Sequence, residues 1–174
     1  MKVSVETVKE LRRLTSSSIA NCRQALDESG GDLQKAKDWL RKKGLEIAAK
    51  KQQDEVKEGR IEAYVHTGNK IGVLVEINCE TDFVARNNDF CQFCRDIAMQ
   101  IAAASPIYIR KEDVPPEVVT QEKDAELFFK AHCLLEQVYI KDTSITVKDY
   151  LGNLIGKISE NIQIKRFSRF ALGG

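Results

Sequence analysis

Two cysteines three residues apart, Cys91 and Cys94, are the first residues in this chain whose spacing could carry chemistry. A redox Cys-x-x-Cys motif normally lies at the start of a helix, where the helix dipole lowers the pKa of a thiol. Here the motif lies inside an apolar run with helical spacing, and Cys94 falls on the core-facing stripe. The pattern therefore favours buried or half-exposed thiols over a redox site.

A zinc site is the second chemistry that these residue types suggest, and it needs four ligands. The remaining candidates show no paired spacing: His66, His132, Cys79 and Cys133. Five cysteines is also an odd number without the spacing of a small disulfide scaffold, so reduced thiols are expected. We predict no metal site and no cofactor.

Catalysis and nucleotide binding have little support in the sequence. The chain has two histidines, no Gly-x-Ser-x-Gly elbow and no Gly-x-x-x-x-Gly-Lys loop. The 27 basic and 26 acidic side chains give a net charge of +1, which argues against a broad grip on nucleic acid. A small basic strip is formed by Lys165, Arg166 and Arg169. It could touch nucleic acid, but the pattern favours the solvated face of a terminal strand. We expect a protein that is neither an enzyme nor a nucleic-acid binder.

The segment from Asn78 to Asn87 is more informative, because it links a predicted hairpin to a predicted long helix. Phe83 lies outside the periodic apolar run that starts at Phe90. An aromatic residue at a strand-to-helix turn is usually a lid on the core. The alternative is an exposed anchor that inserts into a partner's pocket. Composition and spacing favour neither interpretation of Phe83 decisively.

The elements that position this segment begin with three predicted helices in residues 1–44. The first carries apolar residues at helical spacing: Val5, Val8, Leu11 and Leu14. After the polar loop Thr15–Ser18, the second ends at Gly30–Gly31, since glycine suits the left-handed residue that closes a helix. The third begins after Asp32 and is predicted to end at Gly44. One apolar face per helix predicts a small three-helix bundle.

The segment 45–59 is rich in Lys and Glu, and we interpret it as a linker with some helix. Apolar residues then alternate with polar ones on both sides of the Thr67–Lys70 turn, which predicts a β-hairpin. A helix with a core-facing stripe follows from Phe90 to Ile101 and stops at Ser105–Pro106.

The last third of the chain adds further elements. A short strand at 107–109 and a helix from Pro116 to about residue 130 are predicted. Thr146 and Asp149 have the spacing of a capping box that opens another helix. Residues 161–172 predict a strand whose alternation slips near Lys165–Arg166, which indicates a bulge.

The predicted fold class is therefore α+β. Residues 1–55 form a three-helix bundle and linker, and residues 56–174 form a core with a small antiparallel sheet, of about three strands, packed with helices. With 43% apolar and 30% charged residues, the composition is that of a soluble folded protein. The sequence lacks an apolar run long enough to cross a membrane and begins as a helix rather than a secretory signal. We expect the cytoplasm, or an organelle matrix, and no membrane partner.

Several segments, in order, resemble the elongation factor Ts family. INCETDFVARN at 77–87 is very close to that family's most recognisable segment, and similar stretches cover nearly the whole chain. These are VKELRRLT at 8–15, CRQAL at 22–26, AAKK at 48–51, IGVLVE at 71–76, CLLEQ at 133–137, GKISENIQIKRFSRF at 156–170 and the closing ALGG. Residues 22–40 also resemble ubiquitin-associated-like bundles, the fold that the family uses at its N-terminus.

The resemblance implies a guanine nucleotide exchange factor of translation elongation. Such a factor binds elongation factor Tu loaded with GDP and promotes GDP release by disturbing the magnesium and phosphate site. By resemblance, the segment Thr81, Asp82, Phe83 and Val84 contacts the nucleotide-binding domain of the GTPase. Phe83 would wedge between helices there, and Asp82 would disturb the magnesium environment. On the bundle, the docking face would hold Arg12, Ile19 and Ala20.

The chain departs from the family pattern in two places. A Thr-Gly-x-Gly loop followed by two large apolar residues is replaced by Thr15-Ser16-Ser17-Ser18-Ile19-Ala20, which implies weaker docking of the bundle. The region 117–132 is short. Short members pair through their single core, which implies a homodimer here.

The alternative function is a non-exchanging adaptor, in which the bundle binds another protein and the core is only a structural support. A metal- or thiol-dependent enzyme is a more distant one.

Overall fold

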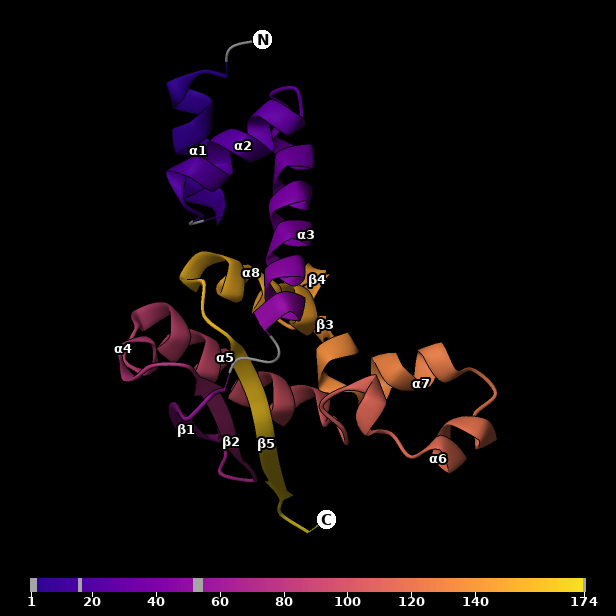
Figure 1. Cartoon of the computed structure of the whole chain (residues 1–174). Helices are drawn as coiled ribbons and strands as arrows, with labels where there is room; N and C mark the ends of the chain where they lie inside the picture. Colours follow the sequence, from indigo (N-terminus) through magenta and orange to yellow (C-terminus); the bar gives the residue numbers. More distant parts are fainter. Residues whose placement is uncertain (1–2, 16, 52–54, 174) are drawn as a thin grey trace. The chain divides into compact units, whose positions relative to one another are not determined.

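The computed structural model describes residues 3–15, 17–51 and 55–173 (Figure 1). Ser16 of the predicted loop and residues 52–54 of the predicted linker lie outside the described residues. The chain packs into two compact units. The first comprises Met1–Asp54 and Leu151–Asn161, and the second comprises Glu55–Tyr150 and Ile162–Gly174. Residues 151–161 thus pack with the first unit, although they follow most of the second in sequence.

The first unit begins with three helices, α1 (Val5–Thr15), α2 (Ile19–Glu28) and α3 (Leu33–Lys51). Each of the first two starts at a serine cap. The Ser4 hydroxyl accepts a hydrogen bond from the Thr7 N–H at 3.1 Å, and the Ser18 hydroxyl accepts one from Asn21 at 3.1 Å. Such caps satisfy backbone donors that the helix itself leaves without partners.

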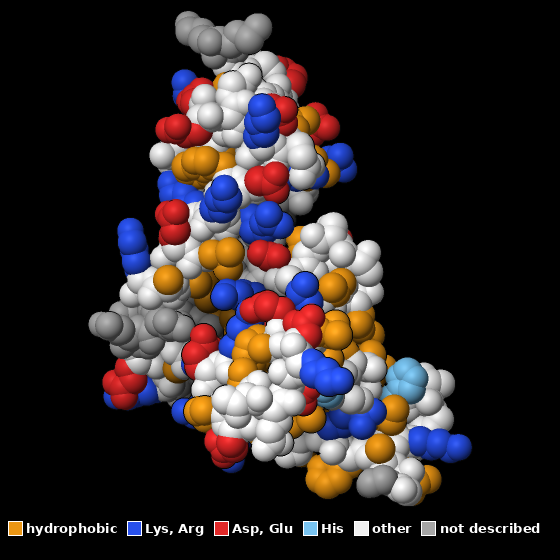
Figure 2. Space-filling model, turned by 90° about the vertical axis from the view of Figure 1, so that its right-hand side faces the viewer, with side chains coloured by type: hydrophobic (Ala, Val, Ile, Leu, Met, Phe, Trp, Pro, Cys, Tyr) orange, Lys and Arg blue, Asp and Glu red, His pale blue; other side chains and the backbone are white. Residues whose placement is uncertain are grey.

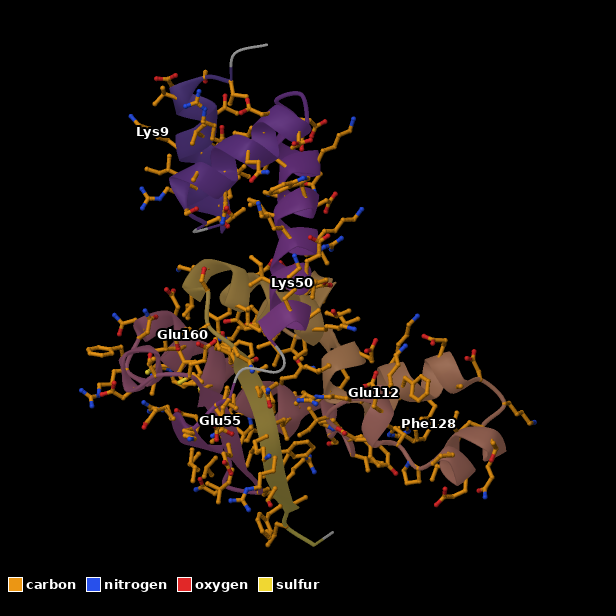
Figure 3. The ribbon with its side chains drawn as sticks, in the orientation of Figure 1. Lys9, Lys50, Glu55, Glu112, Phe128 and Glu160 are labelled. Carbon is orange, nitrogen blue, oxygen red and sulfur yellow. The ribbon has the colours of Figure 1, made fainter. Side chains whose placement is uncertain are left out.

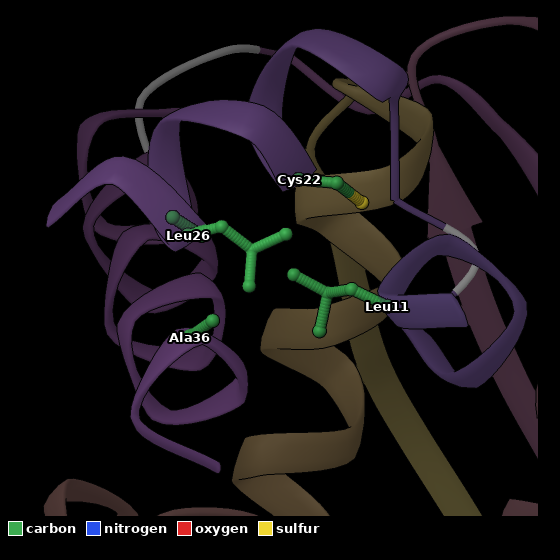
Figure 4. Close-up of a cluster of buried hydrophobic side chains, with 5 residues drawn as sticks. Leu11, Cys22, Leu26 and Ala36 are labelled. Atoms are coloured by element: carbon green, nitrogen blue, oxygen red, sulfur yellow. The ribbon is translucent and has the colours of Figure 1, made fainter. Parts of the chain in front are cut away.

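Five small or medium side chains form the centre of the bundle: Leu11, Cys22, Ala25, Leu26 and Ala36. Figure 4 shows Leu11, Cys22, Leu26 and Ala36 gathered between the helices. The predicted apolar faces are only partly buried. Val5, Leu14 and Ile19 are 63%, 45% and 59% exposed. The bundle therefore keeps a narrow core and presents several apolar side chains to solvent.

The prediction that α3 ends at Gly44 is wrong, because the helix continues to Lys51. The glycine serves close packing instead of termination. A Cβ atom at Gly44 would lie 2.5 Å from the carbonyl oxygen of Gly152, in the part of α8 (Val147–Ile158) that belongs to the first unit. The absence of a side chain allows the two helix backbones to meet.

The second unit is built on a three-stranded antiparallel sheet of order β1-β2-β5, with β1 at Glu58–Val65, β2 at Ile71–Cys79 and β5 at Ile162–Ala171. The predicted hairpin joins β1 to β2. The predicted bulge is confirmed, since the register shifts where Glu76 pairs with Arg166 and Ile77 pairs with Ile164. The α+β fold class is confirmed.

One face of the sheet is covered by α5 (Asn88–Ala104), which contacts β1 and β2. The helix buries its predicted stripe, Phe90, Phe93, Cys94, Ile97 and Ile101, and β2 buries Val73, Val75, Ile77 and Cys79. The Arg169 guanidinium on β5 donates hydrogen bonds to the Ala102 carbonyl of α5 at 3.2 and 3.3 Å. These contacts make the main hydrophobic core.

The opposite face, which we call the open sheet face, carries exposed apolar side chains. Between β1 and β2, Ala63 pairs with Leu74 and Val65 pairs with Gly72. Between β2 and β5, Leu74 pairs with Ser168 and Gly72 pairs with Phe170. The exposed members are Ile61, Val65, Leu74 and Phe170, at 66%, 62%, 49% and 69%. Side chains of directly paired residues lie on the same face of a sheet, so these form one surface.

The remaining elements are short. They are α4 (Asp82–Ala85), η1 (Lys111–Asp113), α6 (Pro116–Gln121), α7 (Ala125–His132), η2 (Leu134–Glu136), β3 (Val138–Tyr139) and β4 (Asp142–Thr146). The single helix predicted through residue 130 is two helices, because the Asp124 carboxylate caps α7 by accepting from the Leu127 N–H at 3.0 Å. The predicted strand at 107–109 makes one isolated bridge, Tyr108 with Cys133.

The capping box at the start of α8 is confirmed. The Thr146 N–H donates to the Asp149 carboxylate at 3.0 Å, and the Asp149 N–H donates to the Thr146 hydroxyl at 3.1 Å. Over the face in view in Figure 2, exposed hydrophobic side chains are interspersed with acidic and basic ones. None of the helices in the described ranges is both long and apolar enough to cross a membrane.

Candidate functional site

The most distinctive surface feature of the second unit is α4, a single helical turn between β2 and α5. Thr81 is its N-cap, and the Thr81 hydroxyl accepts a hydrogen bond from the Val84 N–H at 3.4 Å. The Cys79 thiol, buried at the end of β2, donates to the Thr81 carbonyl at 3.2 Å. After α4, the Asn87 side chain caps α5 by accepting from the Asp89 N–H at 2.8 Å. Local hydrogen bonds therefore define both ends of the turn.

Phe83 and Val84 are neighbours on α4 with very different exposure. Val84 is 8% exposed, whereas Phe83 is 81% exposed. Neighbouring positions on a helix differ in direction by about 100°, so a short turn can bury one residue and present the next. The exposure excludes the interpretation of Phe83 as a lid on the core. A large aromatic side chain held outward by a fixed backbone has the properties of an anchor for a partner.

Asp82 lies beside Phe83 in the first turn of α4. Its carboxylate forms an ion pair with Arg86 at 2.8 Å, and the Arg86 side chain is 77% exposed. An exposed pair of this kind contributes little to stability. The Asp82 carboxylate can therefore exchange Arg86 for another cation at small cost.

Cys91 and Cys94 are residues of α5, and Cys91 contacts α4. The Cys91 thiol donates to the Ala85 carbonyl at 3.6 Å and accepts from the Arg60 guanidinium at 3.5 Å. Cys94 is fully buried, and burial raises the pKa of its thiol to about 12. The Cys94 thiol is thus protonated at neutral pH and does not act as a nucleophile. Within residues 3–15, 17–51 and 55–173, no group of three or more His, Cys, Asp or Glu side chains could hold a metal ion.

A hydrogen-bond network around the buried Asp96 connects α5 to Tyr139, Lys141 and Tyr150. The sequence did not predict this network. The Asp96 carboxylate accepts hydrogen bonds from Gln92, Lys141, Tyr139 and Tyr150 at 2.7 to 2.9 Å. Burial raises the pKa of Asp96, but the hydrogen bonds, first that from Lys141, outweigh burial and lower it below the usual value. The only signal in sequence is the spacing of Gln92 and Asp96, four residues apart on one helix face.

On the bundle, Arg12, Ile19 and Ala20 are all exposed. They belong to the first unit, whereas Thr81–Val84 belong to the second. Ile19 is the first residue of α2, directly after the Ser18 cap. Leu14, which the sequence pattern placed on the buried face, is exposed as well and is a further candidate for contact with a partner.

Comparison with known proteins points to one family over nearly the whole chain. A family model described as Elongation factor TS matches residues 5–127. Proteins named elongation factor Ts from Carboxydothermus hydrogenoformans and Caldanaerobacter subterraneus are 50% and 48% identical over 98% of this chain, covering 89% and 97% of their own lengths. One from a Geobacter species is 45% identical over 99% of this chain and 91% of its own. These alignments extend over 194 to 196 positions, more than the 174 residues here, so the relatives carry residues without a counterpart.

Proposed function

Because the chain belongs to the elongation factor Ts family of translation elongation factors, we propose that it is a guanine nucleotide exchange factor for elongation factor Tu. In this proposal it binds elongation factor Tu carrying GDP and promotes GDP release by disturbing the magnesium and phosphate site. It makes and breaks no covalent bond and needs no cofactor. The observation that carries the proposal is the 81% exposure of Phe83 on a capped helical turn.

Phe83 supplies the binding energy at the contact. Exposed aromatic residues that enter a pocket on a partner are frequent hot spots in interfaces. Thr81 and Val84 hold the turn in shape, through the cap and through burial respectively. A rigid turn loses little conformational entropy on binding, so more of the contact energy is available for the complex.

Asp82 acts on the metal environment in this proposal. Magnesium and the contacts of the phosphate loop hold a guanine nucleotide tightly in such GTPases. An approaching carboxylate that takes a cationic partner from this site weakens the hold on GDP. The exposed ion pair with Arg86 at 2.8 Å keeps Asp82 oriented until the GTPase is bound.

The thermodynamics of exchange sets a condition on both proteins. A partner that prefers the nucleotide-free conformation lowers GDP affinity by the ratio of its affinities for the two states. Coupling between two ligands is reciprocal, so GDP or GTP must weaken the grip of this protein on the GTPase by the same factor. The factor is thereby released when a new nucleotide binds.

We propose that residues 1–55 and 56–174 act as two docking modules in the cytoplasm. The bundle docks through Arg12, Ile19 and Ala20, and the core docks through Thr81–Val84. Two linked contacts bind more tightly than either alone, since the second forms at a high effective concentration. The small Ala20 side chain lowers the contribution of the bundle.

The open sheet face supports a homodimer through the core. It carries exposed Ile61, Val65, Leu74 and Phe170 on one side of the sheet. A contiguous apolar surface of this kind usually marks an interface. A second copy can pack its own sheet against it face to face, as in a β-sandwich.

The test is GDP release from elongation factor Tu preloaded with a fluorescent GDP analogue. We expect the purified protein to increase the release rate in proportion to its concentration until saturation, without hydrolysing GTP. A GDP release rate that stays at its basal value at saturating concentration would overturn the proposal. Binding without faster release would instead support the adaptor function.

A further inference from the structure

A cleft of about 470 Å³ in the first unit is lined by four basic side chains. We call it the basic cleft, and its lining residues are Lys9, Arg12, Arg13 and Lys157. The first three share one face of α1, because residues spaced i, i+3 and i+4 are neighbours on a helix. Lys9 projects outward from α1 (Figure 3). Lys157 comes from the last turn of α8.

The three side chains from α1 form no ion pair with any residue in the described ranges. Placing like charges together without acidic partners costs energy, which an acidic ligand relieves. The three α1 residues of the basic cleft also belong to a segment with an excess of positive charge. Residues 1–51 hold 12 Lys and Arg against 7 Asp and Glu, whereas the whole chain holds 27 against 26. The excess of positive charge is therefore confined to the N-terminal part.

We propose that the basic cleft steers association with an acidic surface of elongation factor Tu. This inference rests on the proposed function, since Arg12 is both a lining residue and a member of the proposed docking face. The remainder of the chain has more acidic than basic side chains and would repel a long phosphate polymer. A local acidic patch on a protein fits the cleft better than a nucleic acid does. Lys9, Arg13 and Lys157 then extend the docking face beyond the three residues that resemblance implies.

Electrostatic steering acts mainly on the association rate and is screened by salt. Complementary charge raises association rates by roughly 10- to 1,000-fold at low ionic strength. The Debye length falls from about 30 Å at 0.01 M to about 3 Å at 1 M ionic strength, so the effect disappears at high salt. The prediction is therefore a rate constant whose salt dependence depends on these side chains.

The experiment compares the wild-type protein with the variant K9Q/R13Q/K157Q by stopped-flow mixing with elongation factor Tu, between 50 and 500 mM KCl. We expect the association rate constant of the variant to be about tenfold lower at 50 mM KCl and to approach the wild-type value at 500 mM. The variant K9Q/R13Q, with changes on α1 alone, should show a smaller decrease. All three substituted side chains are polar and at least partly exposed, so folding is checked by an unchanged melting temperature.

The matched control is R23Q/K42Q/K50Q, which removes three exposed charges of the same unit that do not line the basic cleft. It should stay within about twofold of the wild type. Equal rate constants and salt slopes for both triple variants would overturn the inference. The proposed function would still be supported if the wild-type protein accelerates GDP release from elongation factor Tu. Loss of single-stranded RNA binding in K9Q/R13Q/K157Q, with unchanged association with the GTPase, would also overturn it in favour of a nucleic acid.

Discussion

Phe83 and Phe90 lie seven residues apart and have opposite environments. Phe83 is 81% exposed on α4, and Phe90 is fully buried on α5. The sequence indicated the burial of Phe90, because that residue begins a stripe with helical spacing. No pattern indicated the exposure of Phe83, since a one-turn helix is too short to show periodicity. The direction of that side chain depends on the Thr81 cap and on the burial of Val84.

Phe83→Ala should remove most exchange activity at little cost in stability. No internal cavity forms when an exposed side chain is truncated, so the melting temperature should stay near that of the wild type. The loss of an interface hot spot is worth about 2 kcal/mol or more, which is at least about thirtyfold in affinity for the GTPase. GDP release and thermal unfolding, measured on the same sample, test both parts.

Phe90→Ala is the matched control, because it truncates the same side chain in the core. It should destabilise the fold by about 3–5 kcal/mol. A Phe83→Ala protein that exchanges GDP normally would show that the anchor function does not belong to Phe83.

Asp96→Asn should lower the stability at neutral pH by about 1–3 kcal/mol, the cost of leaving buried polar groups imperfectly paired. The asparagine has the shape of aspartate but replaces one acceptor oxygen by a donor, which opposes the Tyr139 and Tyr150 hydroxyls. Urea unfolding at pH 7 measures the difference. Asp27→Asn, at an exposed position of α2, should leave the stability unchanged.

The same residue predicts a pH dependence. The folded pKa of Asp96 is lowered, so the carboxylate contributes stability fully above the unfolded value of about 3.9. That contribution is lost as the pH falls through the folded pKa. We expect wild-type unfolding free energies to decrease more steeply below about pH 4 than those of Asp96→Asn. Parallel curves for the two proteins in acid would contradict this assignment.

At the scale of elements, the sequence predicted most helices and the hairpin but misjudged two boundaries. Gly44 has the residue type of a helix end, yet its role depends on Gly152, more than a hundred residues later in the chain. Glu122–Asp124 interrupt a helix because Asp124 caps α7, which spacing alone did not reveal. The short ladder of β3 with β4 was also missed, since a strand of two residues carries no alternation.

Gly44→Ala should destabilise the protein by about 1–3 kcal/mol, the usual range for overpacking. The new methyl group would meet the Gly152 carbonyl oxygen at 2.5 Å. A glycine in an unobstructed helix interior would behave in the opposite way, because alanine is more favourable there by roughly 0.5–1 kcal/mol. The sign of the change in unfolding free energy therefore distinguishes close packing from free space.

Gly72→Ala is the control for that measurement. Gly72 lies in β2, and a Cβ atom there would meet nothing within 4 Å. We expect no loss of stability at this position. Stabilisation by Gly44→Ala would show that α3 and α8 do not approach closely.

At the scale of the whole molecule, the open sheet face governs assembly. Leu74→Glu introduces a charge at the centre of this face, since Leu74 lies on the middle strand. Burying an unpaired carboxylate in an interface is strongly unfavourable. If the protein is a dimer through this surface, sedimentation should show a shift to monomer at micromolar concentration.

Leu127→Glu provides the matched control, because Leu127 is 65% exposed on α7, outside the open sheet face. It should leave the sedimentation of the protein unchanged. A wild-type protein that sediments as a monomer even at high concentration would contradict the dimer. Exchange activity that survives in a monomeric Leu74→Glu protein would separate assembly from nucleotide release.

The bulge in β5 gives this strand a position where a residue can be removed without reversing the side chains that follow. Glu76 pairs with Arg166 and Ile77 with Ile164, so Lys165 has no partner opposite it. That extra residue shifts the phase of the strand by half a period, which directs Phe167 and Arg169 toward α5 and Phe170 toward solvent. Removing Lys165 would leave these pairs in place and restore a regular ladder, so Phe167, Arg169 and Phe170 would keep their faces. Removing a paired residue such as Ser168 would instead reverse the side chains on one side of the deletion. A deletion of Lys165 should therefore be less damaging than a deletion of Ser168.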